Sequence, residues 1–239
     1  THCPQINAST AMPTVAITGA AGVIGSVTAE VFDDAGWDLA LIDIGDENRA
    51  TLEASFPDAQ VFDVDLTDAD ATMETFADVW EEQEALDAVL GIAGGFAMQQ
   101  AVESTADDYA RMMELNFRTL FNTARAAVPF LTRADSSFLL GVSAPAALEG
   151  QAEAGLYGAS KAAVASYVKS LGLEEQGAGL RTTVLYPMGV VDTPDNRAAM
   201  PDADPSTWVD PRELADAMLY AATRSPRGHV PELKVRATS

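Results

Sequence analysis

A glycine-rich turn between a short apolar run and an amphipathic helix constrains the fold of this chain more than any other feature. Residues 14–17 are apolar in character, Thr18-Gly19-Ala20-Ala21-Gly22-Val23-Ile24-Gly25 follows them, and helical spacing of apolar residues then continues to Ala35. Glycines between a strand and a helix let the backbone approach a pyrophosphate at the helix N-terminus, where N–H groups lack partners. This order predicts a dinucleotide-binding unit; a tight helix–strand contact is the alternative use of the glycines.

Apolar runs alternate with helical patterns along the rest of the chain. Strands are expected at 37–43, 60–64, 86–92, 137–142, 181–186 and 229–235, and helices at 68–84, 105–131, around Tyr157 and at 211–224. Such alternation is typical of a parallel sheet covered on both faces. We therefore predict an α/β protein with one Rossmann domain over residues 12–239, a doubly wound parallel sheet of about seven strands. Residues 1–11 are expected to be a disordered or tag-like lead.

Composition excludes several classes of partner. The 239 residues include 36 acidic and 14 basic ones, giving a formal net charge of −22. This charge repels nucleic acid and anionic membranes, so neither is a predicted partner. Scarce lysine with high acidity suggests a halophilic protein whose stability falls when salt is removed, and a chain indifferent to salt would refute this.

The N-terminal residues and the apolar content bear on compartment and metal binding. Cys3 is the single cysteine, so no internal disulfide is expected. The sequence has no apolar run of 18 residues and no signal-peptide pattern, which favours a cytoplasmic protein. His2 and Cys3 are the one candidate metal pair, but they lie in the polar lead, so no metal site is predicted.

An acidic residue ends the second expected strand. Asp43 lies 18 residues after Gly25. A carboxylate at this place can accept hydrogen bonds from both ribose hydroxyls of NAD, and it repels the additional phosphate of NADP. The sequence therefore predicts NAD(H) as the preferred cofactor and leaves NADP(H) open.

A tyrosine and a lysine lie four residues apart in the Ala-rich segment 156–163. Positions i and i+4 share one face of a helix, so Tyr157 and Lys161 are expected to be neighbours. An ammonium group that favours the phenolate would lower the pKa of the phenol from about 10 toward working pH. We predict Tyr157 as a general acid/base tuned by Lys161; the alternative is a packed tyrosine and a solvated lysine.

With Asp65-Leu66-Thr67-Asp68, Ala93-Gly94-Gly95 and Asn116, these features resemble the short-chain dehydrogenase/reductase family from Met12 onward. The resemblance implies a single Rossmann domain and an NAD(P)-dependent oxidoreductase of carbonyl or alcohol compounds. It also implies that Asp65 and Leu66 bracket the adenine and that Asn116 holds a proton relay to Lys161. The implied cofactor contacts are Gly19, Ala21, Gly22, Val23, Ile24, Asp43, Asp65, Leu66, Ala93, Gly94, Tyr157, Lys161 and Pro187.

Several stretches depart from the commoner pattern of that family. Gly91-Ile92-Ala93-Gly94 stands where Asn-Asn-Ala-Gly is usual, and segments 146–150 and 192–201 are distinctive. These variants are similar to dihydropteridine reductase and its bacterial relatives, which implies an imine-type substrate. Phe96 and a substrate loop near 188–210 are expected to shape the substrate pocket. The alternatives are a reductase of 3-oxoacyl thioesters or of a small ketone or sugar, and a non-catalytic dinucleotide-binding regulator.

The family's catalytic serine lies 13 residues before the tyrosine, and this position is Ala144 here. If the intervening loop has one extra residue, Ser143 donates a hydrogen bond to the substrate oxygen; otherwise Tyr157 acts without that donor. We include Ser143 in the predicted catalytic set with Tyr157, Lys161 and Asn116. The helices around Asn116 and Tyr157 resemble those that pair family members, which implies a homodimer or homotetramer; light scattering that gave a monomer mass would reject this.

Overall fold

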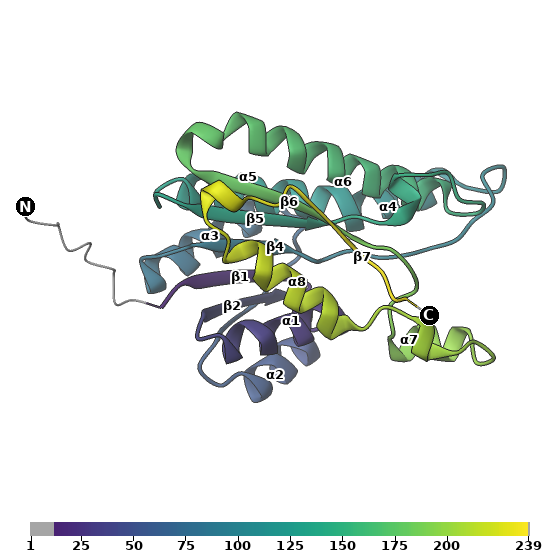
Figure 1. Cartoon of the computed structure of the whole chain (residues 1–239), viewed down its shortest axis with the longest axis horizontal. Coiled ribbons are helices and arrows are strands. Elements are labelled where there is room, and N and C mark those ends of the chain that lie inside the picture. Colours follow the sequence, from purple (N-terminus) through teal and green to yellow (C-terminus); the bar gives the residue numbers. More distant parts are fainter. Residues whose placement is uncertain (1–11, 239) are drawn as a thin grey trace, which may run out of the picture.

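A parallel sheet of seven strands forms the centre of the domain (Figure 1). The computed structural model describes residues 12–238, so the predicted lead at 1–11 lies outside the described residues. The strand order is β3-β2-β1-β4-β5-β6-β7. The bounds are β1 Thr14–Thr18, β2 Asp38–Asp43, β3 Gln60–Asp63, β4 Ala88–Gly91, β5 Ser137–Val142, β6 Leu180–Pro187 and β7 Glu232–Val235. The predicted doubly wound α/β fold is confirmed.

Helices cover both faces of this sheet. On one face lie α1 (Val23–Asp34), α2 (Asp46–Ser55) and α8 (Pro211–Ala222). On the other lie α3 (Ala69–Gln83), α5 (Thr119–Leu131) and α6 (Gly155–Glu174). Two shorter helices, α4 (Ala106–Met113) and α7 (Pro194–Ala199), lie with loops at one end of the molecule, and α7 stands apart from the helical layers (Figure 1). Within residues 12–238, no helix is both long and apolar enough to cross a membrane.

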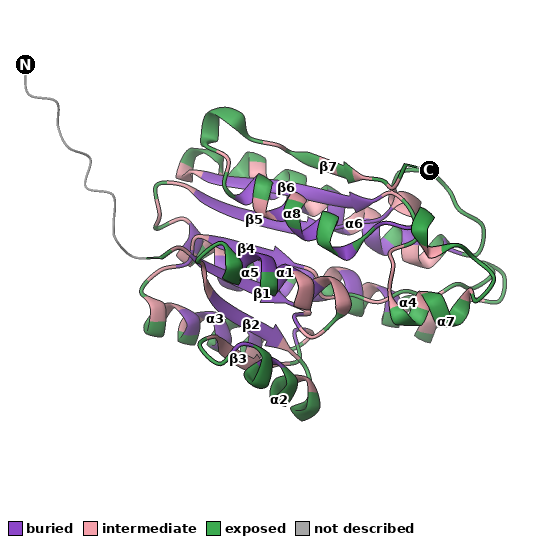
Figure 2. Cartoon of the chain, turned by 60° about the horizontal axis from the view of Figure 1, so that its bottom comes forward, coloured by how far each residue is buried: buried purple, intermediate pink, exposed green. Residues whose placement is uncertain are grey.

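The central strands are largely apolar because each face of the sheet is covered. Successive side chains of a strand point to opposite faces. In β1, Val15 and Ile17 pack with α1 and α8, whereas Ala16 belongs to the core that α3, α5 and α6 close. Figure 2 shows the central strands buried, with the helices exposed on their outer sides, and β7 as a partly exposed edge. A sheet buried on both faces needs apolar residues at nearly every position, which explains the continuous runs.

The structure differs from the predicted elements at three places. The expected helix at 105–131 is interrupted between α4 and α5 by a π-helical turn, Glu114–Arg118. Helix α2 was not predicted because it buries Leu52 alone and so presents no apolar stripe in the sequence. The short helix α7 was likewise not predicted, since none of its side chains is buried.

The chain reverses its direction of winding between β1 and β4. Here Thr18 Oγ1 accepts hydrogen bonds from the backbone N–H groups of Ile92 (3.2 Å) and Ala93 (3.3 Å). Gly19 has φ +69°, and a Cβ atom on it would lie 2.8 Å from the Cα of Ala93. In open α/β sheets, ligands bind beyond the carboxyl ends of the strands at such a switch point. The fold therefore places the glycine turn and the end of β4 side by side at the expected ligand site.

Candidate active site

The glycine turn brings the start of α1 onto the end of β1. A Cβ atom on Gly25 would lie only 2.0 Å from the carbonyl oxygen of Gly19, so glycine is required there. The N-cap of α1 is Gly22, no side chain caps the helix, and its first turn contains no acidic residue. Side chains do cap four other α-helices, through Asp68 on α3, Thr105 on α4, Thr193 on α7 and Asp210 on α8. In so acidic a chain, an uncapped helix start fits the pyrophosphate of a dinucleotide.

Asp43 joins the end of β2 to the glycine turn. Its Oδ2 accepts a hydrogen bond from the backbone N–H of Ala21 (2.7 Å), and its Oδ1 accepts from Ile44 N–H (2.8 Å) and Asn48 Nδ2 (3.1 Å). The half-buried carboxylate is thus held beside the turn with lone pairs left for a further donor. Arg49, the next basic residue along the chain, forms an ion pair with Glu53 at 2.8 Å. The basic residue that follows Asp43 in the sequence is therefore already paired with a carboxylate.

The loop after β3 is fixed by its own turn and by α5. Asp65 Oδ1 accepts hydrogen bonds from the backbone N–H (2.9 Å) and the hydroxyl (2.7 Å) of Thr67. The Leu66 side chain is buried, and its carbonyl accepts from Asn122 Nδ2 at 2.8 Å. Asn122 was not predicted, because nothing in its local sequence distinguishes an inward amide from a surface one. The structure keeps Asp65 and Leu66 at the sheet's ligand-binding edge.

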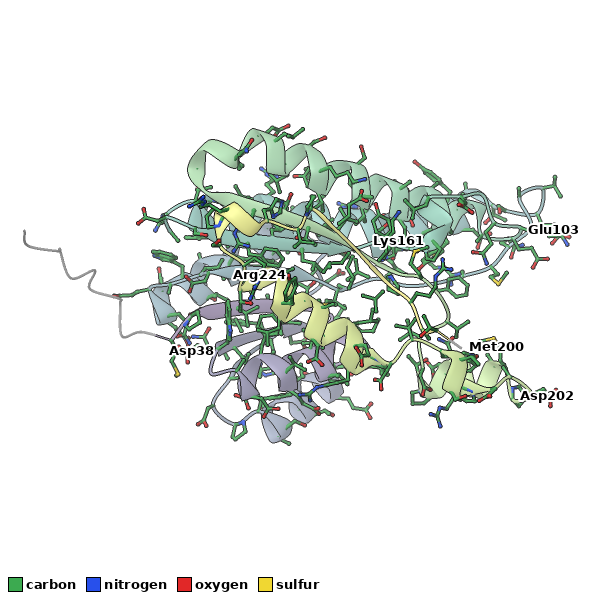
Figure 3. The ribbon with its side chains drawn as sticks, in the orientation of Figure 1. Asp38, Glu103, Lys161, Met200, Asp202 and Arg224 are labelled. Carbon is green, nitrogen blue, oxygen red and sulfur yellow. The ribbon has the colours of Figure 1, made fainter. Side chains whose placement is uncertain are left out.

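Lys161, Asn116 and Gly94 meet beneath α6. The Lys161 ammonium donates to the carbonyl oxygen of Val142 at 3.0 Å, and the residue is 5% exposed. A Cβ atom on Gly94 would lie 2.6 Å from Asn116 Oδ1 and 3.0 Å from Lys161 Nζ. Figure 3 shows Lys161 inside the fold, between Arg224 on one side and Glu103 and Met200 on the other. The structure therefore brings together three of the predicted site residues.

Asn116 lies in the π-helical turn and links two loops of the site. Its side chain accepts from Gly95 N–H (3.0 Å) and donates to the Gly95 carbonyl (3.0 Å) and to Ser160 Oγ (3.1 Å). Ser160 in turn donates to the Tyr157 carbonyl at 2.8 Å. The π turn is thus where a buried amide connects the β4 loop to α6. Ser160 was not predicted, although its place between Tyr157 and Lys161 was a usable signal.

Burial favours the neutral forms of both Tyr157 and Lys161 and shifts their pKa values accordingly. It raises the pKa of Tyr157 to about 12 and lowers the pKa of Lys161 to about 8. The lowering of the phenol pKa that the sequence predicts for Lys161 is not seen in the chain without cofactor. The physical reason is that the ammonium is directed to the Val142 carbonyl, and burial alone sets the pKa of Tyr157.

Ser143 does not fit the predicted role of substrate donor. Its hydroxyl donates to the backbone carbonyl of Lys161 at 2.8 Å, and the residue is 2% exposed. The one proton of this hydroxyl is therefore used inside the protein. Ala144, at the family's usual serine position, is also buried and offers no donor. Of the two interpretations left open by the sequence, the geometry favours a site without a serine donor.

Phe96 lies against the Tyr157 ring, and the segment after β6 carries the short helix α7. Phe96, which is 61% exposed, packs edge-to-face on the Tyr157 ring with centroids 4.9 Å apart. The segment after Pro187, the buried end of β6, is closed at its base by a bridge between Val191 and Val209. An ion pair between Arg197 and Asp192 (2.6 Å) ties α7 to this base.

No group of three or more potential metal-ligating side chains occurs within residues 12–238.

Fold and site together define a dinucleotide-binding α/β protein with a tyrosine and a lysine beside the switch point. The chain belongs to the short chain dehydrogenase family, whose model matches residues 13–204. It is 26% identical over 222 residues to an uncharacterized oxidoreductase of Staphylococcus aureus (strain MW2), covering 92% of this chain and 95% of the relative. An uncharacterized oxidoreductase of Staphylococcus epidermidis (strain ATCC 12228 / FDA PCI 1200) is 24% identical over the same share of each chain.

Solved structures agree with this fold over nearly the whole chain. An NAD+-bound xylitol dehydrogenase superimposes with a TM-score of 0.86 at 20% identity, covering 95% of this chain and 98% of the other. A short-chain glucose/ribitol dehydrogenase from Brucella melitensis gives a TM-score of 0.84 at 25% identity, covering 93% and 94%. The protein is accordingly an oxidoreductase of the short chain dehydrogenase family, which uses a nicotinamide cofactor.

Proposed function

We propose that this protein transfers a hydride between NAD(H) and a small carbonyl, alcohol or imine substrate, with Tyr157 as the general acid/base. The observation that carries the proposal is the meeting of Lys161, Asn116 and Gly94 at the switch point where the glycine turn also lies. A buried lysine without a carboxylate partner costs free energy, so packing alone does not explain a lysine at this place. A non-catalytic regulator would have no use for it.

The bound nicotinamide would supply or accept the hydride, and the chain's residues would supply position and a proton. The phenol of Tyr157 is protonated at neutral pH in the free chain, as donation to a substrate oxygen or nitrogen during reduction requires. Oxidation requires the phenolate, which a nearby ammonium favours. We propose that Lys161 exchanges the Val142 carbonyl for the ribose hydroxyls of the cofactor and then lies where it can act on Tyr157.

The preference for NAD(H) rests on Asp43, and replacing this residue tests it. The Asp43→Ala variant should bind NADH about tenfold more weakly, because it loses the acceptor for the ribose hydroxyls and the anchor of the Ala21 N–H. It should bind NADPH no more weakly than the wild type, because a repelling charge is gone. Fluorescence titration with both reduced cofactors measures this. An Asp58→Ala variant, which removes an exposed carboxylate between α2 and β3, is the control.

Unchanged discrimination between NADH and NADPH in the Asp43→Ala variant would contradict the assignment of this carboxylate to the cofactor.

For the substrate, the distinctive loop at 192–201 and the exposed Phe96 over Tyr157 support an imine of the dihydropteridine type, since a planar ring can stack on an aromatic side chain. A sugar or polyol is the second candidate, because the neighbour from Brucella melitensis is described as a glucose/ribitol dehydrogenase. A 3-oxoacyl thioester is the third. None of the three changes the roles proposed for Tyr157 and Lys161.

A cofactor-coupled screen tests the function and separates the substrates. Oxidation of NADH would be followed at its absorbance with quinonoid dihydropterins, 3-oxoacyl thioesters, simple ketones and sugars, and reduction of NAD+ with polyols. Turnover of one class, abolished in a Lys161→Met variant, is the expected result. Binding of NADH without turnover of any class would favour the non-catalytic regulator.

A further inference from the structure

The end of β5 holds Lys161 through two hydrogen bonds that run in opposite directions. The Val142 carbonyl oxygen accepts a hydrogen bond from the Lys161 ammonium at 3.0 Å. The hydroxyl of the next residue, Ser143, donates one to the Lys161 carbonyl at 2.8 Å. One contact fixes the tip of the side chain and the other fixes the backbone from which it starts. Val142 and Ser143 thus hold both ends of Lys161, and we call this pair of hydrogen bonds the clasp.

The clasp is built on a rigid part of the fold. Ser143 donates its backbone N–H to the Leu185 carbonyl of β6 at 2.8 Å, and Val142 pairs with Leu185 in the register of the sheet. Ser143 and Lys161 are 2% and 5% exposed, so water has little access to either contact. Hydrogen bonds in such surroundings hold their geometry, because an unmade bond there is not replaced by water.

A mid-helix carbonyl needs no additional donor, since the helix itself supplies one. The carbonyl therefore does not need the hydrogen bond from Ser143 in order to be paired. Its effect is to fix α6 along and about its axis relative to β5 at the one residue whose ammonium must reach the cofactor. Errors of about 1 Å in such placement reduce catalysis strongly.

We infer that Ser143 is a positioning residue that sets the place of the Lys161 ammonium through the Lys161 backbone, and that it does not contact the substrate. This inference rests on the function proposed above, in which Lys161 acts on Tyr157 and the cofactor.

The pKa of Lys161 is a sensitive measure of the clasp, because nearly all groups that face the ammonium are neutral. Tyr157 is the titratable neighbour, on the same helix, while the end of β5, the β4 loop and the π turn contribute neutral groups from Val142, Ser143, Gly94 and Asn116. Burial is the resolved cause that lowers the pKa of Lys161 to about 8. Looser packing at Ser143 would admit water and raise this pKa toward the ordinary value.

The experiment uses full-length protein labelled with 13C in lysine, and the chain has three lysines, Lys161, Lys169 and Lys234. Their Cε signals would be followed by NMR against pH without cofactor or substrate. Lys169 serves as the internal contrast, because its hydrogen bond to Glu232 raises its pKa. A Lys161→Arg variant assigns the Lys161 signal by its loss.

The Ser143→Ala variant should raise the pKa of Lys161 by about half a unit or more, and should lower the turnover number about tenfold with the KM for NADH changed less than about twofold. Ser143→Thr, which keeps the hydroxyl, should restore both values. Ser137→Ala is the matched control on the same strand, because Ser137 Oγ is buried without a hydrogen-bond partner within residues 12–238. It should leave both values unchanged.

An unchanged titration of Lys161 in a folded Ser143→Ala variant would overturn the inference, whether or not turnover falls. A fall in turnover with that unchanged titration would return Ser143 to the role of substrate donor. Because the titration needs no substrate, a protein that binds NADH and turns nothing over would refute the proposed function while the clasp is still tested.

Discussion

Replacing Tyr157 with phenylalanine is expected to lower turnover by at least about a thousandfold while changing the affinity for NADH less than about twofold. The phenol is the proposed proton donor, and phenylalanine removes its oxygen alone. The ring that packs edge-to-face on Phe96 at 4.9 Å is kept, so the substrate entrance should keep its shape. Steady-state turnover numbers and fluorescence titration of NADH measure the two quantities separately.

Tyr167→Phe is the matched control for this prediction. Tyr167 lies on the same helix, α6, and its ring packs on Phe117 with centroids 5.8 Å apart. Its hydroxyl is far along the helix from the proposed site, so its loss should leave turnover within about twofold. A Tyr157→Phe variant that retained turnover would remove this tyrosine from the chemistry, even if the rest of the site were correct.

Replacing Gly25 with alanine is expected to have the second large effect, on both stability and cofactor binding. The added Cβ atom would lie 2.0 Å from the Gly19 carbonyl oxygen and 2.8 Å from the Ala20 Cα, so backbone must move. Overpacking of this kind costs about 1–3 kcal/mol of unfolding free energy or more. The affinity for NADH should also fall at least about tenfold, because the displaced atoms form the turn beneath the pyrophosphate.

Denaturant unfolding and NADH titration test these two effects, with Gly177→Ala as the control. Gly177 lies in an exposed turn after α6, and a Cβ atom there would meet open space, so the control should retain both properties. If Gly25→Ala kept its stability and its affinity for NADH, the turn would not be the close contact that the structure describes.

The sequence predicts most of the sheet because its central strands are buried on both faces. In β1 and β4, every position is buried, so the apolar runs stand out from any surface segment. The glycine turn was predictable for a related reason. A Cβ atom on Gly25 would lie 2.0 Å from the Gly19 carbonyl oxygen, so glycine alone fits. This requirement is therefore visible in the sequence.

Contacts between elements distant in the sequence could not be predicted in the same way. Asn122 reaches the Leu66 carbonyl across 56 residues, and Ser160 meets Asn116 across 44. The direction of the Ser143 hydroxyl is a similar case, because the Lys161 carbonyl that accepts it becomes its neighbour only when α6 packs on β5. Residue type and spacing do not specify which of two nearby acceptors a short polar side chain selects.

The pKa of Tyr157 in the chain without cofactor also depends on a contact between distant elements. A lysine four residues away on a helix shares its face, but its long side chain can extend toward any acceptor within reach. Here the acceptor is the Val142 carbonyl, at the end of a strand that the spacing of Tyr157 and Lys161 does not reveal. Burial then decides both pKa values.

A crystal structure of the protein with NAD+ tests the central claim most directly. The measured quantities are the distances from Lys161 Nζ to the nicotinamide ribose hydroxyls and from Tyr157 Oη to the substrate side of the nicotinamide. We expect the pyrophosphate on the glycine turn at Gly22, the Lys161 ammonium within hydrogen-bonding distance of the ribose, and the Tyr157 hydroxyl facing the reactive carbon. A dinucleotide bound elsewhere, or one whose nicotinamide lies away from both side chains, would contradict it.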